Sequence, residues 1–478
     1  MRIFIFILCF WVLPVQCLDL PDMGSSADNI LSPIEEQKIA KSLLRQLRRE
    51  VDMVDDVEIY NYINSLGQKL VSYSEMSNQP FYFNMLNESS INAFATPGGL
   101  VCVHSGLMLS ARSESEFASV FAHEIAHVTQ RHIARKLEAV GQTSIPMIAA
   151  MLGGILLGSV TGNMDITQAG LMMAVAGNIQ MQIHFTRLHE KEADRVGIDL
   201  LAKAGFEPRD MPHFFQRIQE ESRLYTKPPA FLLTHPMSID RAAEATDRAE
   251  NYPPANYLDS NTYHLARAKV LVLTTDKSMR KLVEQLENML KQGRYNNEIA
   301  VHYGLALALL ENRQIEKVQQ HIDWLTKNDT DRVIYRILQA RFALLHKDLA
   351  KTEKIYIQAL KVYPNDVQLT LAFSEYLLRH AKQPKKAQEL LTKLGEQPFP
   401  QYYRLLAQAY EESLQFAESY LAMAEQYYLL GETRLAVEQL KQARKRDDIS
   451  YFLASRVEAR YKELNKELAE MENKNEES

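Results

Sequence analysis

Cysteine and tryptophan are scarce in this sequence of 478 residues, which contains three cysteines and two tryptophans. Cys9 and Cys17 lie in the N-terminal segment, so a chain that loses this segment keeps only Cys102. An internal disulfide is then excluded even in an oxidising compartment, and stability must come from a hydrophobic core.

Positive charge is not in excess either. The chain has 54 lysines and arginines against 60 acidic residues, a net charge of -6 and a pI near 6.2. No basic field is available to hold a phosphate backbone, so no nucleic acid is expected as a partner. The apolar fraction of 46% and the charged fraction of 24% are ordinary for globular proteins, and the length predicts at least two domains.

The N-terminus lacks an apolar run long enough to span a bilayer, which takes ~20 residues. Its opening stretch, MRIFIFILCFWVLPVQC, instead combines one early cation with a short apolar run. We predict a signal peptide over 1–17, cleaved after Cys17 with Val15 at the third position before the cut, so the protein is exported. Lipidation of Cys17 is an alternative that requires a small residue where Gln16 stands, and an uncleaved anchor is the remaining one.

A second apolar region covers 142–182 and includes MIAAMLGGILLGSV. Its continuous apolar part is about 14 residues long, too short to cross a bilayer and long enough to lie on one or to line a groove. A pair of buried hairpin helices fits the same length. This region is therefore a candidate for peripheral membrane contact.

The sequence pattern from 18 to 255 predicts a domain of helices around a small β-sheet. Apolar spacing is helical over 32–70, and FYFNML and LVCVHSGLML alternate like strands on either side of the turn at 97–99. Ser113 and Glu116 form a candidate capping box, which opens a helix that should run to about Leu137. A later amphipathic helix should end at Gly205, and prolines mark the end of the domain near 255.

The part from 260 to 465 predicts an α-solenoid of tetratricopeptide repeats. The residues in register are Val318, Thr352, Ala387 and Ala436, separated by 34, 35 and 49 positions. The repeat period is about 34, so an extra helix should precede the last repeat. Stacked repeats normally build a concave peptide-binding surface, and plain helical hairpins are the alternative. We expect the tail, 466–478, to be disordered.

The segment FAHEIAHVTQRH carries the first candidate metal ligands. His123 and His127 are four residues apart, so on a helix they share one face and can direct two imidazole nitrogens at a zinc ion ~2.0 to 2.1 Å away. Glu124 projects beside them, within reach of a water on the metal but without being a ligand. A catalytic zinc needs a third protein ligand and one open position.

The segment HEKEAD offers that third ligand. Glu190 and Asp194 are again four residues apart, so one carboxylate can ligate the metal while the other orients a ligand imidazole from behind. Two acids on a helix more often form a solvated face, but Ala193 and the apolar periodicity around them favour an inward-facing pair.

Other histidines fit the site less well. His132 has a poor angle for the same metal and should be a surface or core residue. His104 and His184 have no partner at ligand spacing, and His189 is a rival third ligand beside Glu190. His235, in LLTHPMSIDR, could swing to the open zinc position or stabilise the oxyanion of the transition state, and capping of its loop is the alternative.

These parts predict a zinc endopeptidase. Zinc lowers the pKa of its water towards ~7 and polarises the scissile carbonyl, while Glu124 takes the proton and later delivers it to the leaving amine. LVCVHSGLML could be an edge strand that pairs with an extended substrate, or an ordinary interior strand.

Four motifs together resemble a known family. NAFATPGG, HEIAH, EKEAD and THP are similar to motifs of the membrane-associated zinc metalloproteases that include the stress protease HtpX and the CAAX prenyl protease. With the leading LPDMGSSA, the signal peptide and the repeats, the chain resembles the periplasmic members that assist β-barrel assembly at the outer membrane of Gram-negative bacteria. The resemblance implies a zincin-like α+β domain followed by the solenoid.

The resemblance also implies roles for the site residues. His123, His127 and Glu190 would bind one zinc per chain, Glu124 would be the catalytic base, and Asp194 would support the ligands. The protein would help barrel assembly as a chaperone and degrade misassembled barrels, with the barrel assembly machinery and the lipopolysaccharide-transport barrel as partners. The alternative is an assembly chaperone or adaptor whose protease is latent because His235 occupies the open position.

Overall fold

The computed structural model describes residues 31–140, 148, 152–154, 187–222, 229–255, 257–447 and 449–476. The predicted signal peptide, most of the apolar region 142–182 and His184 lie outside this part of the chain. Ile148 and Leu152, the apolar residues of that region that the structure does describe, are buried in a cluster that α1 (Pro33–Glu50) helps to form. No helix within the described ranges is both long and apolar enough to cross a membrane.

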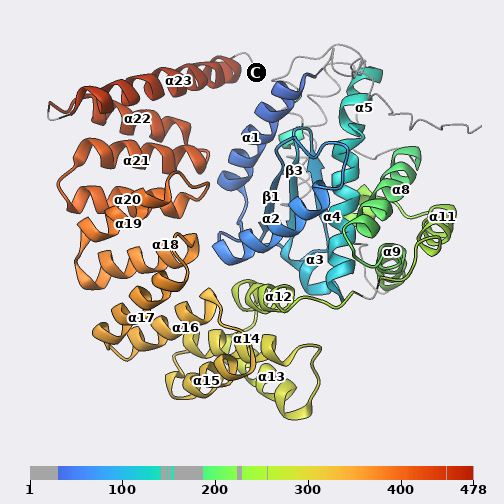
Figure 1. Ribbon diagram of the computed structural model, residues 1–478. Helices are drawn as coiled ribbons and strands as arrows, with labels where there is room; N and C mark the ends of the chain where they lie inside the picture. Colours follow the sequence, from blue (N-terminus) through green and yellow to red (C-terminus); the bar gives the residue numbers. More distant parts are fainter. Residues whose placement is uncertain are drawn as a thin grey trace, which may run out of the picture.

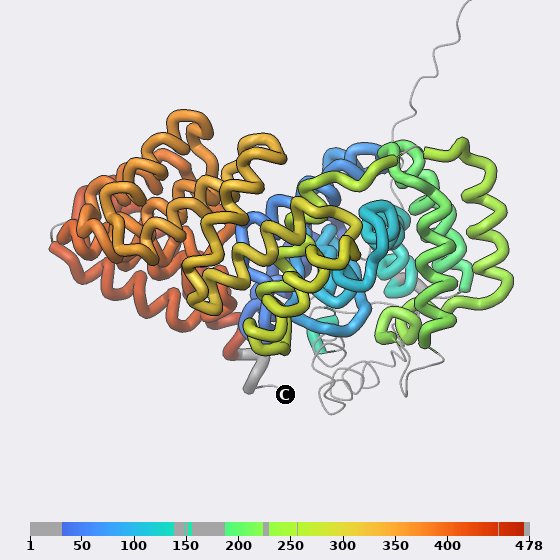
Figure 2. Tube along the Cα trace, turned by 90° about the horizontal axis from the view of Figure 1, so that it is seen from below, coloured from blue at the N-terminus to red at the C-terminus, as the bar shows by residue number. Residues whose placement is uncertain are grey.

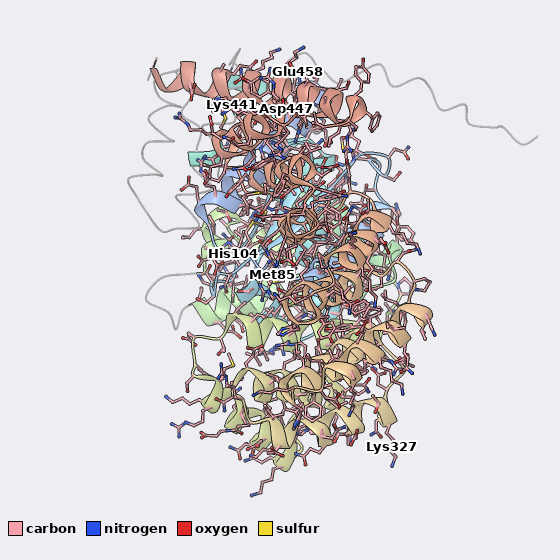
Figure 3. All side chains as sticks on the ribbon, turned by 90° about the vertical axis from the view of Figure 1, so that its left-hand side faces the viewer. Met85, His104, Lys327, Lys441, Asp447 and Glu458 are labelled. Carbon is pink, nitrogen blue, oxygen red and sulfur yellow. The ribbon has the colours of Figure 1, made fainter. Side chains whose placement is uncertain are left out.

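The first part of the chain is a mainly helical domain with one small sheet, as predicted (Figure 1). After α1 its elements are α2 (Val57–Val71), β1 (Tyr82–Leu86), β2 (Ala93–Thr96), β3 (Leu100–His104), α3 (Ser105–Ser110), α4 (Glu114–Thr129), α5 (His132–Val140), α8 (Arg187–Lys203), α9 (Asp210–Ser222), α10 (Ala230–Thr234) and α11 (Ile239–Glu250). The helix α4 runs beside the sheet and contacts α8 and α9 on its other side. The residues Met85 and His104, from β1 and β3, lie buried inside the molecule (Figure 3).

The strand order is β1-β3-β2, with β1 parallel and β2 antiparallel to β3. The prediction that LVCVHSGLML supplies an edge strand is wrong, and the interior alternative is confirmed. Every residue of β3 is buried, as expected for a central strand covered on both faces. The strand β2, from the NAFATPGG motif, instead forms the edge of the sheet that contacts α4.

The helix that carries HEIAH is shorter than predicted. Ser113 caps its start by accepting the Glu116 N–H at 2.9 Å, but the Glu116 carboxylate accepts the N–H of Arg112 and does not complete a capping box. The helix ends at Thr129 instead of continuing to about Leu137, because Arg131 has the left-handed value φ = 51°. A new helix, α5, then starts at His132. By contrast, Gly205 ends α8 with φ = 80°, as predicted.

The second part of the chain is an α-solenoid. Its helices are α12 (Asn261–Thr274), α13 (Met279–Gln292), α14 (Glu298–Glu311), α15 (Val318–Asn328), α16 (Val333–Leu345), α17 (Leu349–Val362), α18 (Val367–Tyr376), α19 (Pro384–Leu394), α20 (Pro400–Glu412), α21 (Phe416–Leu429), α22 (Thr433–Arg444) and α23 (Tyr451–Glu476). The four residues placed in register, Val318, Thr352, Ala387 and Ala436, are fully buried on α15, α17, α19 and α22. The extra helix before the last repeat is α20.

The expectation of a disordered tail from 466 is wrong as far as Glu476, because α23 continues to that residue. Leu464 is fully buried in this helix and Leu468 packs on the same cluster. Glu472 pairs with Arg434 of α22 at 2.7 Å. Apolar contacts and an ion pair therefore extend the helix into a sequence whose composition suggested disorder.

The solenoid curves around α1 and α2, which lie between it and the rest of the first domain (Figures 1 and 2). A Cβ atom at Gly431 would collide with the carbonyl oxygen of Arg45, so glycine allows α1 to approach the α21–α22 turn closely. Arg45 also pairs with Glu467 of α23 at 2.6 Å, and Lys269 of α12 pairs with Glu58 of α2 at 2.8 Å. Part of the inner face of the solenoid is therefore covered by the chain's own first domain.

Candidate metal centre

Three parts of the first domain bring four candidate ligands together. His123 and His127 project from α4, Glu190 from α8, and His235 directly follows α10. Each of them is almost completely buried and offers one ligand atom, and these four atoms all lie within 4.8 Å of one another. No other such group of histidine, cysteine and acidic side chains occurs among the described residues.

The distances within this group suit a tetrahedral metal. The Nε2 atom of His123 lies 3.0 Å from Nε2 of His127 and 3.3 Å from Nδ1 of His235. The two oxygens of the Glu190 carboxylate divide the remaining contacts: Oε2 lies 3.5 Å from Nε2 of His123, while Oε1 lies 3.5 Å from Nε2 of His127 and 3.0 Å from Nδ1 of His235. Four ligands ~2.0 to 2.1 Å from a tetrahedral zinc are about 3.3 Å apart, so the residues fit the ion.

Close packing of α4 on α8 makes this geometry possible. Gly197 is a buried residue of α8, and a Cβ atom there would lie 3.2 Å from the backbone of Ala122 and His123 and 2.8 Å from Cε of Met211. A larger residue at 197 would push α8 away from α4, and Glu190 would move away from the histidines with it.

Asp194 lies behind the cluster, not in it. Its Oδ1 atom is 3.0 Å from Nδ1 of His123, the ring nitrogen on the opposite side from the one that faces the other candidate ligands. This contact holds the ring and leaves Nε2 directed at the centre of the group. Of the two carboxylates in EKEAD, the structure therefore turns Glu190 towards the cluster and Asp194 towards a histidine.

Arg241 is part of this site, and the sequence reading missed it. This buried residue of α11 donates to Asp194 through Nε at 2.5 Å and Nη2 at 2.8 Å, and its Nη1 lies 2.5 Å from Glu190. It also bonds the Pro236 carbonyl at 3.2 Å, which ties it to the loop of His235. The signal in the sequence that could have identified Arg241 is its position at the end of HPMSIDR, shortly after His235.

Burial and these partners shift the pKa values of the site in opposite directions. Burial alone would raise the pKa of Glu190, but His235, His123 and Arg241 hold it well below its usual range. Burial likewise opposes ionisation of Asp194, but Arg241 lowers the pKa of this carboxyl. Burial raises the pKa of the Glu124 carboxyl, whose Oε1 lies 3.3 Å from Nε2 of His235. Glu190 is therefore kept as an anion, while Glu124 is poised to exchange a proton.

His104, His132 and His189 lie outside the cluster of candidate ligands. His104 is buried at the end of β3, with Nδ1 2.8 Å from the Ser90 hydroxyl. His132 is a core residue, one of the two predicted possibilities, and its Nδ1 lies 2.8 Å from Nδ1 of His127. His189 stacks on His132 with the ring centres 4.5 Å apart and does not join the cluster as a third ligand.

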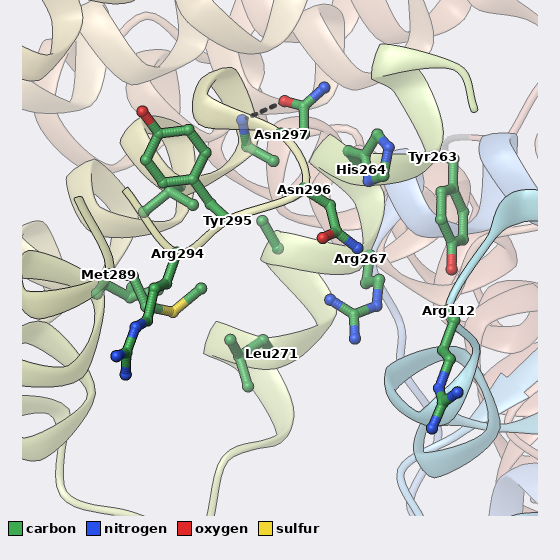
Figure 4. Close-up of a pocket in the computed structure, with 14 residues that line it drawn as sticks. Arg112, Tyr263, His264, Arg267, Leu271, Met289, Arg294, Tyr295, Asn296 and Asn297 are labelled. Carbon is green, nitrogen blue, oxygen red and sulfur yellow. Dashed lines mark hydrogen bonds between the residues drawn. The ribbon is translucent and has the colours of Figure 1, made fainter. Parts of the chain in front are cut away.

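A separate cavity of about 230 Å³ lies where the α3–α4 connection meets α12, α13 and α14 (Figure 4). Arg112, Arg267 and Arg294 line it, and Asn297 at its edge caps α14 by accepting the Ala300 N–H at 2.8 Å. None of the four candidate metal ligands lines this cavity. The candidate metal centre is therefore separate from this cavity.

Comparison with known proteins agrees with this geometry. The sequence matches Peptidase family M48 over residues 60–249, a range that includes every candidate ligand, Glu124 and Arg241. It is 34% identical over 450 residues to the beta-barrel assembly-enhancing protease of Escherichia coli K12, which covers 93% of this chain and 91% of that one. The chain belongs to the beta-barrel assembly-enhancing proteases of family M48.

Two further relatives have narrower matches. A Vibrio cholerae relative is 40% identical over 318 residues, which cover 66% of this chain and 65% of its own length. Metalloprotease LoiP of Escherichia coli is 29% identical over 188 residues, 39% of this chain and 67% of its own. Membership of this family makes the chain a metalloendopeptidase and implies a metal, which the cluster of three histidines and Glu190 could hold.

Proposed function

We propose that this chain is a periplasmic endopeptidase that binds one zinc ion through His123, His127 and Glu190. The observation that carries the proposal is the convergence of four buried side chains, whose ligand atoms all lie within 4.8 Å of one another and whose nearest contacts of 3.0 to 3.5 Å are close to the ligand separations of tetrahedral zinc. When bound, zinc supplies Lewis-acid activation of water and of the scissile carbonyl.

Glu124 is the proposed general base. It lies next to His123 on α4, is buried, and has a raised pKa, so it can take a proton from the attacking water and return it to the leaving amine. Asp194 and Arg241 hold the His123 ring and the Glu190 carboxylate in place. An extended substrate would pair with β2, the strand at the edge of the sheet beside α4.

The proposed clients are outer-membrane β-barrel proteins. Relatives that match this chain over 91% and 93% of their length are named beta-barrel assembly-enhancing proteases, which supports a role in barrel assembly. The finer proposal is that the protein acts there both as a chaperone and as a protease that degrades misassembled barrels. The barrel assembly machinery and the lipopolysaccharide-transport barrel are the proposed partners. The domain from 18 to 255 would perform the chemistry, and the repeats from 260 to 465 would recruit clients through the surface that α1 and α2 leave free.

A latent protease is the second candidate function, and one observation favours it. His235 directs Nδ1 at the same point as the three proposed ligands and Nε2 at Glu124. A catalytic zinc site keeps one position open, whereas four protein ligands close it. His235 would then have to leave before water can enter, and the chain could act as a chaperone or adaptor while the site is closed.

The test compares bound zinc and casein cleavage for the wild type, Glu124→Gln and His123→Ala. We expect about one zinc per chain in the wild type and in Glu124→Gln, with cleavage lowered about 10² to 10⁴-fold in the latter because the base is lost. His123→Ala should lose both zinc and cleavage. The matched control is Glu244→Gln, which removes a surface carboxylate paired with Lys191 and should change neither. A wild type that takes up no zinc, or full cleavage by Glu124→Gln, would reject the proposal.

His235→Ala separates the interpretations of this histidine. If His235 closes the site, the variant should keep zinc through the other three ligands and cleave casein faster than the wild type. Slower cleavage with zinc retained would instead favour its role as a stabiliser of the oxyanion. Unchanged cleavage would reject both functional roles and leave the loop-capping interpretation.

A further inference from the structure

A series of hydrogen-bonded side chains behind His127 connects it to residues of α5 and α8. Nδ1 of His132 lies 2.8 Å from Nδ1 of His127, and Nε2 of His132 lies 3.0 Å from Oε2 of Glu192. We propose that His132, held by Glu192, is a positioning residue that fixes the tautomer and the ring orientation of His127. This inference rests on the proposed role of His127 as a metal ligand.

The backbone between the two histidines is shaped for this contact. In one continuous helix, His132 would lie five residues beyond His127 and point to another side. Instead α4 ends at Thr129, and the left-handed residue Arg131 turns the chain so that His132 opens α5 facing back to His127. The Arg131 guanidinium stabilises the turn by donating to the Leu31 carbonyl at 2.7 Å and pairing with Glu36 at 3.0 Å.

The hydrogen bonds assign the ring protons of His127 and His132. A His127 ring that offers its Nε2 lone pair to a metal carries its proton on Nδ1. Nδ1 of His132 must then accept that proton, so the His132 proton sits on Nε2 and is donated to Glu192. Arg135 lies 3.0 Å from the same Glu192 oxygen and keeps this carboxylate an acceptor.

Both histidines of α4 are therefore supported from behind, by different means. Nδ1 of His123 has the Asp194 carboxylate at 3.0 Å, whereas Nδ1 of His127 has a histidine that passes the interaction on to Glu192. Loss of such an outer partner typically lowers metal affinity or activity about 10 to 100-fold. We expect an effect of this size when His132 can no longer accept the bond.

The solenoid contains a matched control for any change at His132. His302 and His321 also bring their Nδ1 atoms to 2.8 Å, and His321 is buried, but this pair lies in α14 and α15. Substitution of His321 disturbs an equivalent histidine pair without touching the metal centre. The comparison distinguishes the general effect of removing a buried histidine from the specific effect of removing the hydrogen-bond partner of His127.

The experiment compares His132→Asn, His132→Gln and His132→Phe in the full-length chain. The amide oxygen of asparagine can reach the position of Nδ1 and accept the bond from His127, whereas glutamine places its amide near the position of Nε2. The measurements are the zinc dissociation constant by chelator competition, the absorption spectrum of the cobalt-substituted protein and the Tm of the metal-free protein. His321→Asn, His321→Gln and His321→Phe are measured alongside.

We expect His132→Asn to bind zinc within a few-fold of the wild type, and His132→Gln and His132→Phe to bind about 10 to 100-fold more weakly with an altered cobalt spectrum. None of the His321 variants should change zinc affinity. A residue that only fills space would give the opposite order, because asparagine fills least of the cavity. Equal zinc affinity in all three His132 variants, or weakest binding by His132→Asn, would overturn the inference.

Glu192→Ala tests the hydrogen bonds from His127 through His132 to Glu192 without a change in the core, since Glu192 is only partly buried. It removes the acceptor that holds the His132 tautomer, so zinc binding should weaken, and Glu244→Ala is its surface control. Unchanged zinc affinity of Glu192→Ala would count against the proposal even if a His132 variant fails to fold. A wild type that binds no zinc would instead reject the proposed function, and this inference with it.

Discussion

Two pairs of histidines in this molecule bring their Nδ1 atoms to 2.8 Å: the buried His127 and His132 in the first domain, and the half-buried His302 with the buried His321 in the solenoid. Their surroundings differ. In the first pair, His132 contacts Glu192 and His127 contacts a third histidine, His123. In the second pair, His302 stacks on Trp324, with the ring centres 3.8 Å apart.

The contrast extends to the two domains. The first domain buries carboxylates and a guanidinium beside its histidines, an arrangement that costs free energy unless every charge has a partner. The solenoid core is built mostly from apolar and small residues that let helices pack closely. A buried histidine by itself therefore does not mark a site, and the buried carboxylates around it do.

The largest expected effect on stability comes from Arg241→Ala. This change leaves Glu190 and Asp194 buried without their cation, and breaking a buried pair in this way typically costs about 3 to 5 kcal/mol. Denaturant unfolding of the metal-free protein, followed by circular dichroism, should show the loss in the transition of the first domain. The control is Arg434→Ala in the solenoid, whose exposed pair with Glu472 is worth at most about 1 kcal/mol. Equal effects of the two changes would erase the contrast between the domains.

A smaller effect is expected from overpacking the solenoid. Ala436 is fully buried on α22, which packs closely against α21, so Ala436→Leu should lower the free energy of unfolding by about 1 to 3 kcal/mol. The same measurement on Glu438→Leu, at an exposed position of α22, should show little change. Zinc affinity should be equal in both variants and the wild type. A weaker zinc site in Ala436→Leu would show that the two regions are coupled more tightly than their separate cores suggest.

The smallest effect concerns pH. Burial, followed by the neighbouring His302, lowers the pKa of His321 to about 4, while an unfolded histidine has a pKa near ~6.5. The unfolded chain therefore binds a proton that the folded solenoid excludes. The contribution of His321 to stability is complete above pH 6.5 and is lost as the pH falls towards 4. Unfolding midpoints measured across this window should fall less steeply for His321→Gln, and an unchanged slope would contradict the assignment.

The sequence by itself determined which side chains of α4 share one face, and it determined the repeat architecture. Four-residue spacing on a helix places His123 and His127 on one face with Glu124 beside them, whatever surrounds the helix. The same local logic placed Val318 and Ala436 on buried helix faces of the solenoid. Both results depend on helical periodicity, which acts between near neighbours in the chain.

Tertiary structure decided what periodicity could not. It turned Glu190 towards the cluster and Asp194 behind it, because Arg241 approaches both from another helix. It brought His132 back to His127 through the left-handed turn at Arg131, which is stabilised by contacts with α1 and the residue Leu31 preceding it. The physical reason is the same in both cases: a side chain's protonation and direction depend on partners far away in the sequence, and only folding brings those partners within bonding distance.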